Sequence, residues 1–246
     1  MSIDQFRNWI KESRSIVFFG GAGTSTESKI PDFRTAGGLY DKKTSKYPYP
    51  PEQMLSRTFY MQHPDIFFEY YKENLIYPDA KPNKAHFALA ELEKQGKLKA
   101  VITQNIDGLH QMAGHAEVIE LHGSIHENYC ESCGLKYDLS EFLLLPGGSP
   151  TCPACGGRVR PDVTLYEEGL KTYVIEKAIQ TIATCDMLII GGTSLVVYPA
   201  AGMINYFKGD KLVLINRDAT QVDGKADLVF RESIGEVLHE AVFTDD

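Results

Sequence analysis

Four apolar segments, each ending at a glycine or polar cluster, constrain the fold of this chain more than any other feature. They have the length of strands and carry no alternating polar residues, so we expect both faces of each strand to be covered, as parallel sheets require. Helical patterns separate the segments, which predicts a doubly wound, Rossmann-like α/β fold. The segments are residues 15–19 before the cluster 20–25, 100–103 before Gln104 and Asn105, 187–190 before 191–194, and 211–215 before 216–218.

The cysteine spacing is the strongest metal signal in the chain. Cys130 and Cys133 form one C-x-x-C pair, and Cys152 and Cys155 form a second. In a chain with five cysteines and no sign of secretion, this spacing predicts zinc rather than disulfides. Four thiolates leave no open coordination position, so the zinc is predicted to be structural. Cys185 borders an apolar segment and is predicted to be a buried core thiol.

Two stretches break the strand–helix rhythm and are predicted to form a small domain beside the sheet. Residues 35–77 give a helical insert rich in aromatic side chains, and residues 126–160 give the zinc-binding insert. The Rossmann-like domain then comprises residues 1–34, 78–125 and 161–246. Helices are predicted at residues 4–12, 64–75, 85–95, 173–184 and 199–207.

Composition and charge limit the classes of partner. The chain has 246 residues, of which 43% are hydrophobic and 24% charged, as in ordinary globular proteins. A net charge of -8 argues against direct nucleic-acid binding, which needs a basic face. No apolar run approaches the roughly 20 residues that span a bilayer, and no secretory leader is recognised. We therefore expect a cytoplasmic protein without a nucleic-acid or membrane partner.

The polar strand ends suggest ligand chemistry, because open α/β sheets bind ligands at the carboxyl ends of their strands. The turn at Gly21 and Gly23 can admit a phosphate, although Thr26 stands where the full dinucleotide fingerprint has its third glycine. A tight structural turn explains the same glycines. His122, near Asn105, can do acid/base chemistry at neutral pH, or can belong to a hydrogen-bonded loop.

Two further groups have both a functional and a structural interpretation. Phe33 and Arg34, which follow Asp32, can cover a ring and pair with an anion, or can act as an apolar anchor beside a surface arginine. Small polar groups that end two other strands suit ribose or phosphate, or serve as helix caps and turns. These groups are Gly192, Thr193, Ser194 and Asn216.

Taken together, these motifs closely resemble the sirtuin family of NAD-dependent protein lysine deacylases, in its compact bacterial form. The order and spacing of the matching segments carry the resemblance nearly to the C-terminus. The matching segments are residues 21–23, 30–34, 103–107, 121–123, 192–197 and 215–216, together with the four paired cysteines.

The resemblance implies a deacetylase that moves an acetyl group from lysine to ADP-ribose and releases nicotinamide. His122 is implied as the general base on a ribose hydroxyl, with Asn105 positioning ribose and water, and Asp107 holding the nicotinamide carboxamide. The implied partners are NAD as co-substrate, one structural zinc ion and acetyl-lysine-bearing proteins. The implied NAD contacts are Gly21, Ala22, Gly23, Thr26, Asp32, Phe33, Arg34, Gln104, Asn105, Ile106, Asp107, His122, Gly192, Thr193, Ser194, Asn216 and Ile234.

Departures from the family pattern concern substrate choice. Lys29 and Glu167 stand where relatives usually have glycine, and the second lies in a segment that relatives pair with the peptide backbone. Relatives that prefer succinyl or malonyl lysine carry a tyrosine and, three residues later, an arginine. The corresponding residues here are Tyr71 and Asn74. Without a cation to hold a carboxylate, we expect neutral acyl groups, above all acetyl.

Three other functions are weighed against deacetylation. Protein mono-ADP-ribosyl transfer does not require activation of a ribose hydroxyl, so His122 favours deacylation. A nonenzymatic NAD sensor does not need the set Asn105, Asp107 and His122. A zinc-ribbon nucleic-acid binder conflicts with the acidic balance of the chain.

Overall fold

A computed structural model describes residues 2–32 and 47–243, and its main sheet is parallel throughout. The strand order is β3-β2-β1-β7-β8-β9, so the chain winds outward in one direction from β1 and in the other from β7. This is the predicted doubly wound arrangement. The strands are β1 (Ile16–Gly20), β2 (Leu98–Thr103), β3 (Val118–Glu120), β7 (Met187–Gly191), β8 (Lys211–Ile215) and β9 (Leu228–Phe230).

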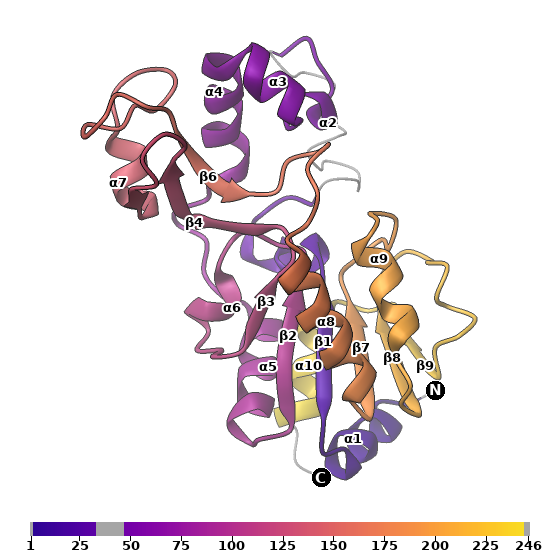
Figure 1. Cartoon of the computed structure of the whole chain (residues 1–246). Coiled ribbons are helices and arrows are strands. Elements are labelled where there is room, and N and C mark those ends of the chain that lie inside the picture. The colour runs from indigo at the N-terminus through magenta and orange to yellow at the C-terminus, as the bar shows by residue number, and fades with distance from the viewer. Residues whose placement is uncertain (1, 33–46, 244–246) are drawn as a thin grey trace.

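Helices cover both faces of this sheet (Figure 1). Alternate residues of β1 point to opposite layers: Ile16 and Phe18 enter one core, and Val17 and Phe19 enter the other. All five residues of β1 are buried, as expected for a strand with helices on both sides. The first layer contains α1 (Ile3–Glu12), α5 (Lys84–Lys94) and α10 (Ile234–Phe243), and the second contains α8 (Thr172–Thr184) and α9 (Ala200–Met203).

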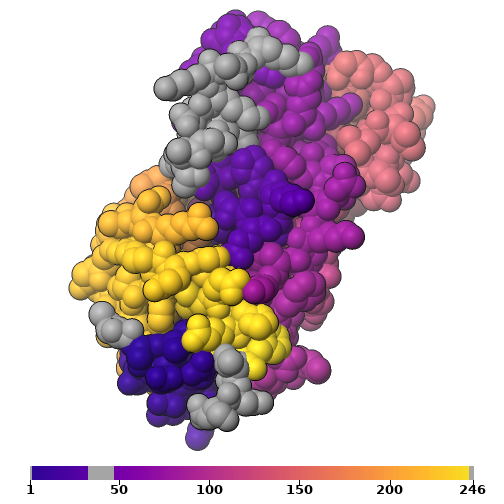
Figure 2. All heavy atoms as spheres, turned by 180° about the vertical axis from the view of Figure 1, so that it is seen from behind, coloured from indigo at the N-terminus to yellow at the C-terminus, as the bar shows by residue number. Residues whose placement is uncertain are grey.

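The predicted strands and helices are confirmed to within a few residues, with one exception in length. The helix predicted at residues 199–207 is α-helical only over α9 and continues as a 3-10 turn, Ile204–Tyr206. Gly202 lies inside it and weakens helix propensity. The short strands β3 and β9 and the helix α10 were not predicted. From behind, the yellow C-terminal segment lies against the indigo N-terminal helix (Figure 2), and α1 contacts α10.

The two inserts share one hydrophobic core, which confirms the predicted small domain. Phe67 and Tyr71 of the helical insert pack with Phe142 and Val159 of the zinc-binding insert. The predicted boundaries at residues 126 and 160 fall inside two strands of its antiparallel sheet, ordered β5-β4-β6. Its elements are α2 (Pro51–Met54), α3 (Arg57–Gln62), α4 (Pro64–Leu75), β4 (Gly123–Cys130), β5 (Lys136–Tyr137), α7 (Leu139–Leu144) and β6 (Val159–Val163).

Across residues 2–32 and 47–243, no helix combines the length and apolar character that a membrane span requires.

Three buried histidines pack against one another near α5 and the short helix α6 (Leu109–Met112). The ring centroids of His86 and His110 are 4.7 Å apart, and those of His110 and His115 are 5.4 Å apart. Within the described part of the chain, neither nitrogen of His110 has a hydrogen-bond partner. Burial, with a smaller contribution from the neighbouring imidazoles, lowers the pKa of His86 to about 3 and the pKa of His110 well below its usual value. Both rings are therefore neutral at pH 7.

We expect the free energy of unfolding to fall as the pH drops below about 6.5, the ordinary pKa of histidine. In that range the unfolded chain protonates His86 and His110 while the folded chain keeps them neutral, so each contributes a loss of up to about 1.4 kcal/mol per pH unit. His110→Leu should flatten this slope in urea unfolding measured over a pH series. His239→Leu, at an exposed position of α10, is the control and should keep the parental slope. An unchanged slope in His110→Leu would contradict the prediction.

Candidate active site

A cavity of about 670 Å³ lies at the carboxyl ends of β1, β2, β7 and β8. This is the topological switch point, because the order of strands reverses between β1 and β7. Its volume is within the range of small-molecule and cofactor sites. The structure brings most of the predicted NAD contacts together here. Those that line the cavity are Ala22, Gly23, Thr26, Asp32, Gln104, Asn105, Ile106, Asp107, His122, Gly192, Thr193, Ser194, Asn216 and Ile234.

Three predicted contacts are not among the lining residues. Gly21 is buried, and an added Cβ there would approach the Cβ of Thr193 to 2.9 Å. Phe33 and Arg34 lie outside the described residues.

The glycines of the first turn serve close packing between two strand ends. The amide of Gly23 donates to the carbonyl of Gly192 at 2.8 Å. An added Cβ at Gly23 would lie 2.7 Å from the Cα of Gly192, closer than side chains permit. These glycines therefore form a tight structural turn, one of the two interpretations of the sequence. Their contact brings the turn after β1 and the turn after β7 together along one wall of the cavity.

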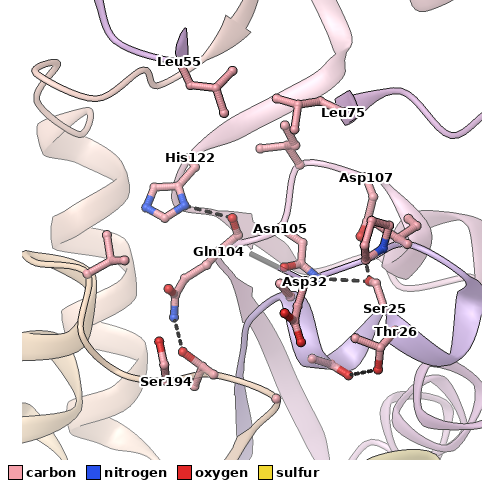
Figure 3. A pocket seen from close by; sticks show the side chains of 18 of the residues that line it. Ser25, Thr26, Asp32, Leu55, Leu75, Gln104, Asn105, Asp107, His122 and Ser194 are labelled. Carbon is pink, nitrogen blue, oxygen red and sulfur yellow. Dashed lines mark hydrogen bonds between the residues drawn. The ribbon is translucent and has the colours of Figure 1, made fainter. Parts of the chain in front are cut away.

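His122 lines the cavity and is held through one of its ring nitrogens. Its Nδ1 lies 2.8 Å from the carbonyl oxygen of Gln104 (Figure 3). A carbonyl oxygen only accepts hydrogen bonds, so Nδ1 carries the proton and Nε2 of the neutral ring is left with its lone pair. Burial lowers the pKa of His122, and the hydrogen bond to Gln104 opposes this shift in part. The imidazole is therefore neutral at pH 7 and able to accept a proton.

The residue after His122 must be glycine for steric reasons. Gly123 has φ of 75°, and a Cβ there would lie 1.8 Å from the carbonyl oxygen of Asp162. This close approach joins β4 to β6, so the small domain begins directly at the histidine.

Ser25, to which no sequence motif points, connects two predicted site residues. The hydroxyl of Ser25 donates to the Asp107 carboxylate at 2.7 Å and accepts from the Asn105 amide at 3.0 Å (Figure 3). The amide of Leu109 donates to the other Asp107 oxygen at 3.0 Å. Burial raises the pKa of Asp107, while these hydrogen bonds lower it in part. The one sequence signal for Ser25 was its place directly after the glycine turn.

Across the cavity floor, a second contact joins the ends of β2 and β7. The side-chain amide of Gln104 donates to the hydroxyl of Thr193 at 3.0 Å. Asn216, at the end of β8, donates instead to the carbonyl of Asp218 at 2.9 Å.

Another part of the wall comes from the small domain and the segment after β6. The sequence motifs point to Asn74 and to the segment around Glu167, but not to the residues of the helical insert nearest to it. Leu55, Leu75 and Tyr77 line the cavity from the helical insert, and residues 163–168 line it beside His122. Asn74 also lines it, and its side-chain amide donates to the carbonyl of Tyr70 at 2.9 Å. Tyr71 is fully buried in the small-domain core and does not belong to the lining.

Both departures from the family's glycines occupy left-handed backbone. Lys29 has φ of 65° and Glu167 has φ of 75°, and Leu195, in the loop after β7, has φ of 54°. Such conformations cost about 1–2 kcal/mol for a residue with a Cβ. Glycine adopts left-handed backbone without strain, which explains why glycine suits positions 29 and 167.

The four paired cysteines are positioned to bind a structural zinc. Their sulfur atoms all lie within 4.8 Å of one another. Both turns have the same form: Gly134 and Gly156 have φ of 74° and donate to the carbonyls of Cys130 and Cys152 at 2.9 Å. The hydroxyl of Tyr137 donates to the Cys152 sulfur at 3.0 Å and lowers the pKa of that thiol to about 6. A thiolate is the form that binds zinc.

Comparison with known proteins identifies the family. Residues 21–199, more than half of the chain, match the Sir2 family. The chain belongs to the Sir2 family. This Sir2 protein is 57% identical over 240 residues to the NAD-dependent protein deacetylase of Clostridium acetobutylicum, with 98% of each chain covered. It is 58% identical over 241 residues to the protein of the same name in Clostridium perfringens, again covering 98% of each.

Solved Sir2 structures share the whole fold. A histidine-to-alanine variant of Sir2, with a deacetylated p53 peptide and 3′-O-acetyl ADP ribose, superposes with a TM-score of 0.88 at 38% identity, covering 97% of this chain and 96% of that one. Sir2 with a p53 peptide and NAD+ gives a TM-score of 0.85 at 38% identity, covering 98% and 97%. The family and the fold class predicted from the sequence are confirmed.

Removing the zinc from this Sir2 protein should disrupt the small domain and the activity together. Cys130 and Cys152 belong to the core shared with the helical insert, so losing the metal removes a cross-link of that core. We expect Cys152→Ser to lower the bound zinc, measured by atomic absorption, and to abolish turnover. Cys185→Ala, in the core of the main domain, is the control and should keep about one zinc per chain. Full activity without zinc would refute the structural role.

Proposed function

We propose that this Sir2 protein is an NAD-dependent protein lysine deacetylase, with His122 as the general base. Acetyl-lysine, NAD and water give lysine, nicotinamide and O-acetyl-ADP-ribose. The observation that carries the proposal is the orientation of His122, whose Nδ1 is bound to the Gln104 carbonyl while Nε2 keeps its lone pair at neutral pH. The names of the clostridial relatives and the solved complexes with NAD+ and O-acetyl ADP ribose support it.

In this proposal NAD occupies the cavity along the strand ends. The nicotinamide lies near Ala22, Ile106 and Asp107, and the Asp107 carboxylate accepts from the carboxamide. Support comes from the position of Asp107, which lines the cavity and whose carboxylate is fixed by Ser25 and Leu109. Gln104 and Asn105 then position the ribose and the attacking water.

The adenosine portion of NAD is assigned to the ends of β7 and β8. Thr193, Ser194 and Asn216 present small hydroxyl and amide groups there, and Ile234 adds apolar surface. Phe33 and Arg34, proposed to contact the nicotinamide ring and the phosphates, lie outside the described residues.

The acetyl-lysine is proposed to enter between the helical insert and the loop at residues 163–168. Leu55 and Leu75 supply apolar surface near His122 (Figure 3). A neutral acetyl group fits such a wall, because burying an unpaired carboxylate is costly. The substrates are then proteins that carry acetyl-lysine.

We also propose a cytoplasmic location, supported by five free cysteines, four of which are placed for a metal.

His122→Ala should abolish deacetylation while leaving NAD binding largely intact. Turnover is measured by mass spectrometry of O-acetyl-ADP-ribose and NAD binding by calorimetry, with His239→Ala as an exposed-histidine control. In the parent protein, activity should be lost as the pH falls through the lowered pKa of His122, so the acidic limb lies below the ordinary value of about 6.5. Unchanged turnover in His122→Ala would refute the mechanism. ADP-ribose attached to protein, without O-acetyl-ADP-ribose, would indicate a mono-ADP-ribosyltransferase.

On two peptides of the same sequence that differ only in the acyl group on the lysine, the protein should remove acetyl faster than succinyl. Asn74→Arg places a cation in the wall and should raise the succinyl-to-acetyl ratio of kcat/KM about tenfold, the effect of one charge-assisted hydrogen bond. The gain is limited because the hydroxyl of Tyr71 is buried in the core rather than directed at the cavity. Asn74→Gln, which adds no charge, should keep the parental ratio. A parent that prefers succinyl would contradict the assignment.

A further inference from the structure

The loop at residues 163–168 is hydrogen-bonded to both sides of the site. At its start, the amide of Thr164 donates to the carbonyl of His122 at 2.9 Å. Two residues later, the amide of Tyr166 donates to the carbonyl of Leu55 at 3.0 Å, and the amide of Arg57 donates back to the carbonyl of Tyr166 at 3.0 Å. The loop therefore joins the backbone of the proposed base to the helical insert.

Glu167 adds a side-chain clamp to this connection. One of its carboxylate oxygens accepts from the backbone amide of Thr58 at 2.8 Å and from the hydroxyl of Thr58 at 2.7 Å. These hydrogen bonds lower the pKa of Glu167, so the carboxylate stays ionised at neutral pH. The contact spans 109 residues of sequence.

The loop completes the N-terminus of α3. The first amides of a helix have no partner within the helix and need other acceptors. In α3 the amide of Arg57 bonds to Tyr166, that of Thr58 bonds to Glu167, and that of Phe59 bonds to the Ser56 hydroxyl at 3.1 Å. Two of the three acceptors therefore come from the loop.

The backbone at Glu167 is held in a conformation that the residue does not favour. Its φ of 75° is unstrained for glycine alone, and the residue is exposed, so core packing does not impose this geometry. Strained backbone persists where surrounding contacts fix it, and it concentrates at functional sites. The two hydrogen bonds to Thr58 are contacts of that kind.

We propose that Glu167 is a positioning residue that clamps the loop at residues 163–168 against α3, so that the wall receiving the peptide around the acetyl-lysine is preformed. This inference rests on the proposed deacetylase function. Leu55 and the loop line the same cavity, so the clamp fixes the width of the entrance between them. A preformed wall lowers the ordering cost of binding, and the benefit should be seen in peptide affinity.

Steady-state kinetics with an acetylated peptide of about ten residues test the proposal, with NAD saturating. Glu167→Gly removes the two hydrogen bonds to Thr58 and should raise the peptide KM about three- to tenfold, the effect of one or two lost hydrogen bonds. The value of kcat and the KM for NAD should stay unchanged. Glu167→Gln keeps an acceptor oxygen, so its peptide KM should lie between those of Glu167→Gly and the parent. Thr58→Val removes the hydroxyl donor, and in that background Glu167→Gly should raise the peptide KM by a smaller factor.

A substrate without flanking residues distinguishes loss of peptide positioning from a general destabilisation of the protein. With acetyl-lysine amide, which has no flanking residues, Glu167→Gly should show the parental KM. Glu141→Gln is the matched control: Glu141 accepts from the amide of Asp138 at 2.9 Å at the start of α7, away from the cavity, and its loss should leave the peptide KM unchanged. An unchanged peptide KM in Glu167→Gly, or an equal rise with acetyl-lysine amide, would overturn the proposal.

Hydrogen exchange tests the clamp independently of turnover. In Glu167→Gly the amide of Thr58 loses its acceptor, and the amide of Arg57 keeps only the carbonyl of Tyr166 in a loop that is held less firmly, so both should exchange faster than in the parent. If the parent has no deacetylase activity, the proposed function fails, and the exchange rates still decide whether the clamp exists. Unchanged exchange at both amides would refute the clamp.

Discussion

The close contact between two glycine turns underlies the rest of this structure. Gly23, after β1, and Gly192, after β7, approach so closely that a side chain on either would displace the other's backbone. Their hydrogen bond fixes the two central strands at the switch point of the sheet. The ends of β2 and β8 follow in register on either side, and the cavity lies where these four ends meet.

The small domain is attached to this frame at the proposed base itself. His122 ends the segment after β3, and β4 begins at the next residue. The same strand ends at Cys130, the first of the zinc-site cysteines. One strand therefore connects the base to the metal site. The zinc site belongs to the hydrophobic core that the two inserts share, and the domain built on that core forms one side of the cavity.

Local strain is concentrated around the same cavity. The three described non-glycine residues with positive φ, Lys29, Glu167 and Leu195, all belong to loops that form it. Leu195 is held from both sides, because its amide donates to the Thr193 hydroxyl at 3.3 Å and its carbonyl accepts from Gln221 at 2.7 Å. Loops that are fixed in this way present their polar groups in one geometry, which a reaction with several substrates requires.

The sequence by itself determined the features whose signals are local. The four long strands follow from continuous apolar runs, the metal site from two C-x-x-C pairs, and most of the cavity floor from the polar residues that end those strands. The short strands β3 and β9 could not be predicted, because three residues are too few to show a hydrophobic pattern.

Only the tertiary structure decided the contacts between distant segments. Ser25 meets Asp107 across 82 residues, and Glu167 meets Thr58 across 109, so neither partner is visible in the sequence around the other. The same holds for His122, because a carbonyl 18 residues away binds Nδ1 and so leaves Nε2 with its lone pair. Residue types and spacing predicted which groups gather at the strand ends, but their protonation and orientation depend on burial and on hydrogen-bond partners that folding alone supplies.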